Sequence, residues 1–104
     1  MAARSELCVP IDVPQGGILS WEFKTDGKDI KFGVVLFALG SYKQGASYDA
    51  APVIIEVAKS GSKGESIAQT LSDCKEGTYL LVFDNRYSMM SSKTVRYALE
   101  VGNA

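Results

Sequence analysis

The most telling absence in this 104-residue chain is histidine, of which it contains none. Without histidine the chain lacks the commonest general base and the commonest metal ligand, and it has no Ser-His or Cys-His nucleophile pair. Its acidic residues do not compensate, because no two carboxylates have a spacing that indicates acid–base catalysis. We therefore expect a protein that is not an enzyme and that holds no metal ion or cofactor.

A surplus of charge is also missing. The formal net charge is −1 and the sequence pI is about 5.3. A domain that binds nucleic acid is usually strongly basic, so we expect no nucleic-acid partner. A peripheral membrane contact would need a local basic patch, because the molecule as a whole offers no attraction for anionic lipid.

Long apolar runs are absent as well. No stretch approaches the roughly 20 apolar residues of a membrane span, and residues 1–10 contain no run of signal-peptide length. No Asn-x-Ser/Thr site occurs. These observations predict a cytoplasmic protein, in which Cys8 and Cys74 are free thiols that behave as small buried hydrophobes. The alternative is a disulfide between two strands.

The chain contains no repeat, low-complexity tract or linker, which predicts one domain over residues 1–104. Short runs of alternating apolar and polar residues fill it, with turn residues between them. No sustained 3.6-residue apolar period occurs. We expect an edge strand at 6–14, a central strand at 30–39, and further strands at 19–23, 52–58, 66–71, 77–85 and 93–101.

This pattern predicts an all-β fold, an antiparallel two-sheet β-sandwich of about seven or eight strands, of the jelly-roll or immunoglobulin-like kind. Residues 16–37 are interpreted as a hairpin that serves as scaffold, with Asp26-Gly27 as its turn. Gly77 and Tyr79 resemble a sandwich corner, in which the tyrosine hydroxyl bonds back to the backbone. A true immunoglobulin domain would carry cysteine where Leu81 stands.

Aromatic side chains are expected to dominate the core. Val53, Ile55 and Val57 are expected to share one face of their strand. The aromatic residues that alternation places on inward faces are Trp21, Phe23, Phe32, Tyr79, Phe83 and Tyr97.

The segment Asp84–Lys93 is the best candidate binding site in the sequence, because it places two methionines in a short polar loop. Methionine adapts its shape to variable partners. Arg86 and Lys93 flank this tip, so it fits a partner's groove or an acidic membrane surface. The alternative is that one methionine plugs the core and the rest is solvated. The candidate site residues are Arg86, Tyr87, Met89, Met90 and Lys93.

Two runs of the sequence resemble the GOLD (Golgi dynamics) domain family. The first is Gly17-Ile18-Leu19-Ser20-Trp21-Glu22-Phe23 with Thr25-Asp26-Gly27 and Asp29-Ile30-Lys31-Phe32-Gly33-Val34, and the second runs from Gly77-Thr78-Tyr79 through Phe83-Asp84-Asn85 to Lys93-Thr94-Val95. The resemblance spans residues 9–101. It implies a compact β-sandwich used for protein–protein contact in membrane traffic and lipid signalling.

Within that family, the Trp-x-Phe and Asp-Ile-x-Phe-Gly patterns are more similar to the cytosolic branch, which accompanies lipid-transfer or acyl-CoA-binding domains. The lumenal cargo-receptor branch has a cysteine where Val82 stands here. The resemblance therefore implies a cytoplasmic adaptor, peripheral at the Golgi or other endomembranes, that binds protein partners. Two alternatives stay open, namely direct binding of anionic or phosphoinositide membranes through Asp84–Lys93, and a structural subunit of a larger assembly or homo-oligomer that uses the edge strand near Cys8.

Overall fold

A computed structural model describes residues 6–25, 30–44, 51–60, 66–85 and 95–102. Within these residues the chain forms seven strands and no helix. The strands are β1 (Glu6–Val13), β2 (Gly17–Thr25), β3 (Ile30–Ala38), β4 (Val53–Ser60), β5 (Ile67–Cys74), β6 (Gly77–Asp84) and β7 (Val95–Gly102).

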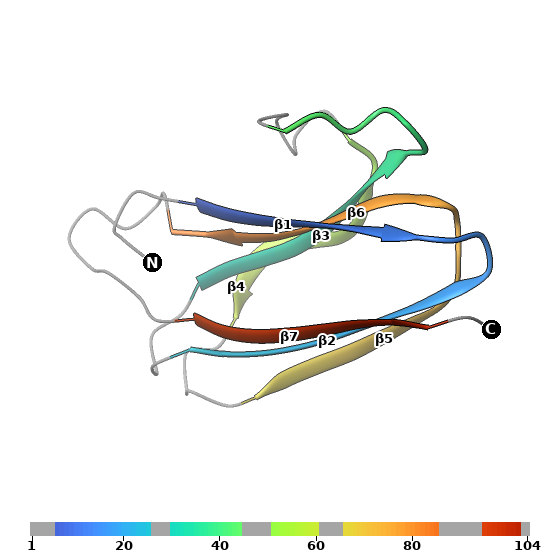
Figure 1. The fold of residues 1–104 in the computed structure, drawn as a ribbon. Helices are drawn as coiled ribbons and strands as arrows, with labels where there is room; N and C mark the ends of the chain where they lie inside the picture. The colour runs from blue at the N-terminus through green and yellow to red at the C-terminus, as the bar shows by residue number, and fades with distance from the viewer. Residues whose placement is uncertain (1–5, 26–29, 45–50, 61–65, 86–94, 103–104) are drawn as a thin grey trace.

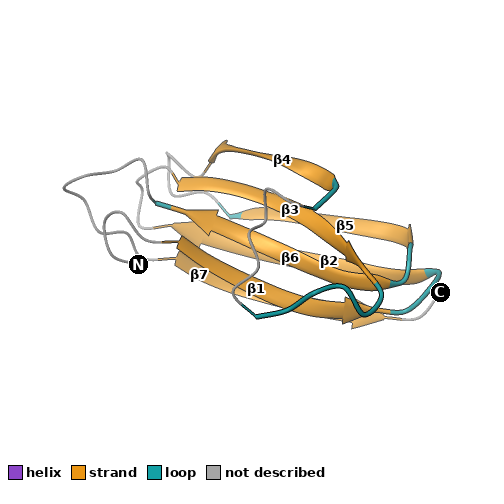
Figure 2. Ribbon diagram, turned by 90° about the horizontal axis from the view of Figure 1, so that it is seen from above, coloured by secondary structure: helices purple, strands orange, loops and turns teal. Residues whose placement is uncertain are grey.

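The strands form two layers, a four-stranded sheet in the order β1-β6-β3-β4 and a three-stranded sheet in the order β5-β2-β7. Every strand pair is antiparallel. Figure 1 shows the two sheets one above the other, and Figure 2 shows the four-stranded sheet from above. The predicted all-β antiparallel sandwich is thus confirmed, as are the edge position of β1 and the central position of β3.

The hairpin predicted at residues 16–37 is wrong, because β2 and β3 belong to different sheets. Their aromatic side chains meet face to face across the core instead of side by side within one sheet. The ring centroids of Phe23 and Phe32 lie 4.5 Å apart, and those of Trp21 and Phe32 lie 5.9 Å apart. Burying these rings between two layers removes more apolar surface from water than a two-stranded ribbon would.

The core between the sheets is aromatic, as predicted. Trp21, Phe23, Phe32, Tyr79 and Phe83 are all buried. Tyr97 is the exception, since it also faces inward and lies 5.6 Å from Phe83 but remains 43% exposed. Its strand, β7, is an edge of the smaller sheet and, among the described strands, pairs with β2 alone, so solvent reaches the ring.

A second apolar cluster covers the outer face of the four-stranded sheet. Val35, Phe37, Leu80 and Val82 point away from the central core and are buried beneath the segment that follows β3. Tyr42 in that segment packs on Phe37, with ring centroids 5.2 Å apart. This second layer explains why β6 is buried on both faces along its whole length.

The two cysteines are free thiols, as the sequence predicts. Cys74 is buried in the central core, where its thiol donates to the Leu71 carbonyl at 3.4 Å. Cys8 packs against the outer cluster, on the other face of the four-stranded sheet. A disulfide between them would need Cα atoms within about 7 Å of each other, which these positions exclude.

Val53 and Ile55 do not share a face, so that prediction is wrong. Ile55 pairs with Val34, which points into the central core, whereas Val53 pairs with Val35, which points outward. The register between β3 and β4 shifts here. A β-bulge inserts an extra residue and breaks the alternation of faces, which no strict period of two anticipates. The Val57 side chain lies outside the described residues.

The corner between β5 and β6 matches the expectation from Gly77 and Tyr79. The Tyr79 hydroxyl donates to the Lys75 carbonyl at 3.0 Å. Gly77 has a φ of 157°, and a Cβ there would lie 2.4 Å from the Phe37 carbonyl oxygen. Only glycine allows the two backbones to approach so closely.

Candidate interaction surface

The loop that the sequence favours as a binding site joins β6 to β7. Arg86, Tyr87, Met89, Met90 and Lys93 all lie outside the described residues. The residues on its flanks are described. Asp84 and Asn85 at the end of β6 are buried, and β7 resumes at the half-buried Val95. The binding role of the loop therefore stays a prediction.

The three-stranded sheet offers a second surface, on the side that faces away from the core. Its central strand β2 pairs with β5 on one side and with β7 on the other, which aligns the outward side chains in rows. No other described segment covers this side. We call it the groove face and define it by nine residues, namely Ser20, Glu22, Lys24, Ser66, Ala68, Thr70, Arg96, Ala98 and Glu100.

Small side chains hollow the groove face along β2. Ala68 and Ala98 pair with Glu22 from either side and leave space above their strands. Two adjoining hollows of about 290 and 450 Å³ result. Glu22 and Ala98 line both of them, so the hollows form one shallow groove that runs along the strands.

Two side-chain hydrogen bonds fix the polar groups on the floor of this groove. The hydroxyls of Ser20 and Thr70 lie 3.1 Å apart across β2 and β5. The Ser66 hydroxyl donates to the Glu22 carboxylate. The second bond ties the carboxylate to Ser66, the residue before β5, while the other members of the row, Ala68 and Ala98, carry no polar side chain.

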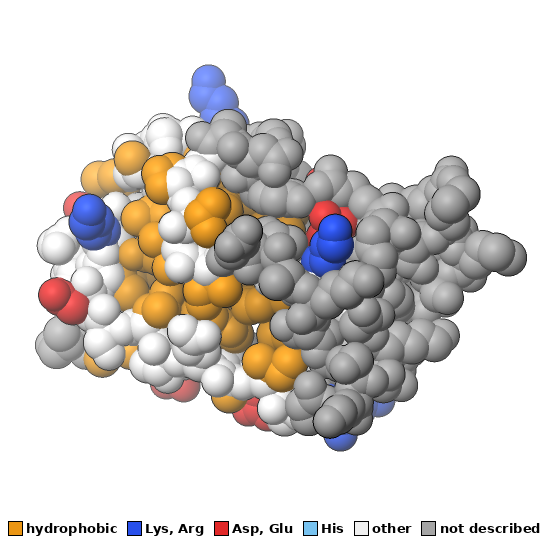
Figure 3. All heavy atoms as spheres, turned by 180° about the vertical axis from the view of Figure 1, so that it is seen from behind, with side chains coloured by type: hydrophobic (Ala, Val, Ile, Leu, Met, Phe, Trp, Pro, Cys, Tyr) orange, Lys and Arg blue, Asp and Glu red, His pale blue; other side chains and the backbone are white. Residues whose placement is uncertain are grey.

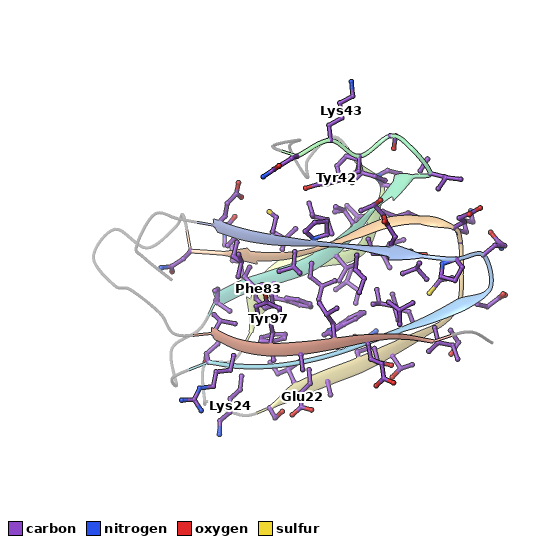
Figure 4. The ribbon with its side chains drawn as sticks, in the orientation of Figure 1. Glu22, Lys24, Tyr42, Lys43, Phe83 and Tyr97 are labelled. Carbon is purple, nitrogen blue, oxygen red and sulfur yellow. The ribbon has the colours of Figure 1, made fainter. Side chains whose placement is uncertain are left out.

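The charges on the groove face are separated along the strands. Lys24 and Arg96 are paired residues of β2 and β7 at one end, and Glu100 lies four residues further along β7. All three are exposed, and within the described part of the chain none forms an ion pair. Figure 4 shows the side chains of Glu22 and Lys24 pointing away from the core, opposite to Tyr97 and Phe83. The groove thus has a basic end and an acidic end.

Local alternation in the sequence is enough to assign the outward positions of this surface, but it does not show which strands bring those positions together. Alternation alone puts Arg96, Ala98 and Glu100 on the polar side of their strand. The juxtaposition of Lys24 with Arg96 depends on the pairing of β2 with β7, two strands separated by some 70 positions in the chain. The missing signal is sheet order, which a single sequence does not encode locally.

Other exposed features lie elsewhere on the molecule. On edge strand β4, Val53 is 60% exposed and Ile54 is 40% exposed. From behind, apolar side chains also gather on the surface (Figure 3). A hollow of about 480 Å³ lies beside Pro14, Leu39 and Tyr42 at the far end of the sandwich, where Asp12 accepts a 2.7 Å hydrogen bond from Thr78.

Neither a metal centre nor a membrane span is found in the described ranges. No three His, Cys, Asp or Glu side chains in them converge on a point that could hold a metal ion. The same residues include no helix of the length and hydropathy needed to cross a bilayer.

The comparison with known proteins gives a partial match. No protein-family model matches the chain. Among curated proteins it is similar to FYVE and coiled-coil domain-containing protein 1 of Homo sapiens and of Mus musculus, with 35% identity over 94 residues in each case. The match covers 89% of this chain but 6% of each relative. The chain therefore corresponds to a small part of these long proteins.

Proposed function

We propose that this chain is a non-catalytic protein-interaction module of the GOLD type that acts as an adaptor in membrane traffic, and that the groove face is its contact surface. The observation that carries the proposal is a solvent-exposed sheet face with a hollow along its centre and three charges that find no ion-pair partner within the described residues. Side chains that face solvent in this way are available to a partner at little cost in reorganisation.

The size of the groove face fits a weak, reversible contact. Three strands about 4.8 Å apart and about five residues long cover on the order of 250 Å², which is about a third of the roughly 800 Å² per partner in a standard interface. Adaptors that bind weakly gain strength when several copies act together. The matched relatives contain a coiled-coil domain by name. A coiled coil brings two or more chains together, and such an arrangement would multiply the contacts.

A blocked groove tests this function. Ala98→Tyr fills both hollows from an exposed position on β7, where a surface change should alter stability by no more than about 0.5 kcal/mol. Ala38→Tyr makes the same change at an exposed position of the four-stranded sheet and serves as the matched control. The protein partners recovered by affinity capture should fall at least tenfold with Ala98→Tyr alone. Equal recovery with both variants would exclude the groove face as the surface that binds these partners.

The β6–β7 loop is tested separately. If Met89 and Met90 contribute to partner binding, the double variant Met89→Asp/Met90→Asp should lose partners that Ala38→Tyr keeps. Full recovery of every partner by this double variant would exclude a role for the methionines.

A second candidate function is direct binding to anionic membranes, favoured by the position of Lys24 and Arg96. Arg96 follows the β6–β7 loop by two residues, so the two cations would add to Arg86 and Lys93. Clustered basic residues each contribute roughly 1 kcal/mol near an anionic bilayer. Co-sedimentation with phosphatidylserine or phosphoinositide vesicles should then exceed that with neutral vesicles and fall in Lys93→Glu. Lipid-independent sedimentation would exclude this function.

A further inference from the structure

The groove face has a charge pattern that specifies its occupant. Arg96 and Glu100 are four residues apart on β7, which corresponds to roughly 13 Å at 3.3–3.4 Å per residue. Lys24 stands beside Arg96, so the basic end presents two cations and the acidic end presents one carboxylate. Glu22 lies midway between the two ends, where its carboxylate already accepts a hydrogen bond from the Ser66 hydroxyl. A ligand that satisfies the two ends must place opposite charges about 13 Å apart.

In an extended peptide, one separation along the sequence places two opposite charges at this distance on the same face. Successive side chains of an extended segment point to opposite faces, so residues separated by an even number of positions face the groove together. A separation of two spans roughly 7 Å and a separation of four spans roughly 13 Å. A separation of three turns one of the two charges away from the sheet.

A helix fits the groove face less well than an extended segment. An amphipathic helix needs a broad apolar bed for its stripe, whereas the floor here is Ser20, Glu22 and Thr70 between two alanines. A second copy of this chain also fits poorly. The face is about a third of the area per partner of a stable interface, and a two-fold axis through the row of Glu22 would set two carboxylates against each other.

We propose that the groove face binds an extended peptide segment of a partner protein that carries an acidic and a basic residue four positions apart. The acidic residue lies over Lys24 and Arg96, and the basic residue lies over Glu100. The residue midway between them faces the groove beside Ala98, where a small or medium side chain fits. This inference rests on the proposed function and names the kind of partner that the module recognises.

Fluorescence anisotropy with labelled nine-residue peptides tests the spacing. Three peptides of identical composition carry aspartate and lysine two, three or four positions apart in a Ser, Thr and Val background. A peptide with the wrong spacing loses one exposed charge pair, so the four-position peptide should bind roughly two- to fivefold more tightly than the other two. The preference should shrink as salt rises from 50 to 500 mM.

Charge reversal on the protein tests the placement. Glu100→Lys and the double variant Lys24→Glu/Arg96→Glu should each remove most of the preference for the four-position peptide. Lys43→Glu reverses an exposed charge outside the groove face and should leave the preference intact. Unchanged circular dichroism spectra and urea midpoints establish that the variants fold.

Equal affinity for the three peptides, an undetectable interaction with all of them, or indifference to charge reversal would overturn the proposal. A preference for anionic vesicles over every peptide would overturn it too. These failures differ from failure of the proposed function. If the peptide proposal alone fails, Ala98→Tyr still recovers fewer partners than Ala38→Tyr. If the proposed function fails, the two variants recover the same partners.

Discussion

At the scale of single residues, Tyr79 connects the sandwich corner to the pH dependence of stability. Burial raises the pKa of its hydroxyl above the ordinary value of 10.0, and the neighbouring Cys74 adds to the rise. The folded chain therefore holds this proton more tightly than the unfolded chain does. The resulting stabilisation is complete below pH 10 and is lost as the pH rises through the folded-state pKa.

The variant Tyr79→Phe removes both effects. The lost hydrogen bond should lower the free energy of unfolding by about 1 kcal/mol at pH 7. The fall in stability as the pH rises above 10 should become shallower than in the wild type. Urea titrations at several pH values measure both quantities. Tyr42→Phe, which leaves Tyr79 in place, should keep the steeper alkaline loss, and equal slopes in the wild type and Tyr79→Phe would contradict the account.

Gly77 allows a close approach of two backbones at the same corner. A Cβ at this position would meet the Phe37 carbonyl oxygen at 2.4 Å and Leu36 Cδ1 at 2.8 Å. Backbone must therefore shift in Gly77→Ala, and we expect a loss of at least about 2 kcal/mol in the free energy of unfolding. Gly102→Ala, which meets nothing within 4 Å, should change it by less than about 0.5 kcal/mol. Similar unfolding midpoints for the two variants would refute this explanation of the glycine.

At the scale of elements, aromatic packing between β2, β3 and β6 holds the two sheets together. Phe32 contacts Trp21, Phe23 and Phe83, with ring centroids between 4.5 and 5.9 Å. Phe32→Ala should cost about 3–5 kcal/mol, which is a large part of a small domain's stability. Tyr97→Ala on the solvent-exposed edge should cost about 1 kcal/mol. Denaturant unfolding compares them, and equal losses would show that β7 closes the core more tightly than its exposure indicates.

Edge strand β4 is where self-association is expected. An edge with exposed apolar side chains is a template for pairing with another chain, and Val53 and Ile54 supply such side chains. Light scattering at increasing protein concentration should show association that Ile54→Lys reduces. Gln69→Lys places the same charge on β5, the edge of the other sheet, and should leave association unchanged. A wild-type chain that stays monomeric at all concentrations would rule out this route to an oligomer.

At the scale of the whole molecule, the sequence predicts the two-layer β-sandwich better than it predicts which strands pair within each sheet. The period-two pattern correctly assigns the sandwich, the central strand β3 and the inward side of Phe83, because burial on one face dictates alternation. It wrongly predicts β2 and β3 as a hairpin. A turn signal such as Asp26-Gly27 indicates that the chain reverses direction, but it does not indicate to which sheet the next strand belongs. The exposure of Tyr97 follows from strand order as well.

The groove face also combines a feature that the sequence predicts with one that it does not. Each of its side chains can be assigned to an outward position from local alternation, yet the basic end exists only because β2 and β7 pair in one register. The predicted binding role of Asp84–Lys93 rests on composition alone, and residues 86–93 of this segment lie outside the described residues.

An amide chemical-shift map of the isotope-labelled chain, titrated with the peptide whose aspartate and lysine are four positions apart, locates the peptide contact on the molecule. We expect the shifts to cluster on the strands of the groove face, around Ser20, Glu22, Lys24, Ala98 and Glu100. Shifts confined to β1, to β4 or to the Arg86–Lys93 loop, with the three-stranded sheet unaffected, would contradict it.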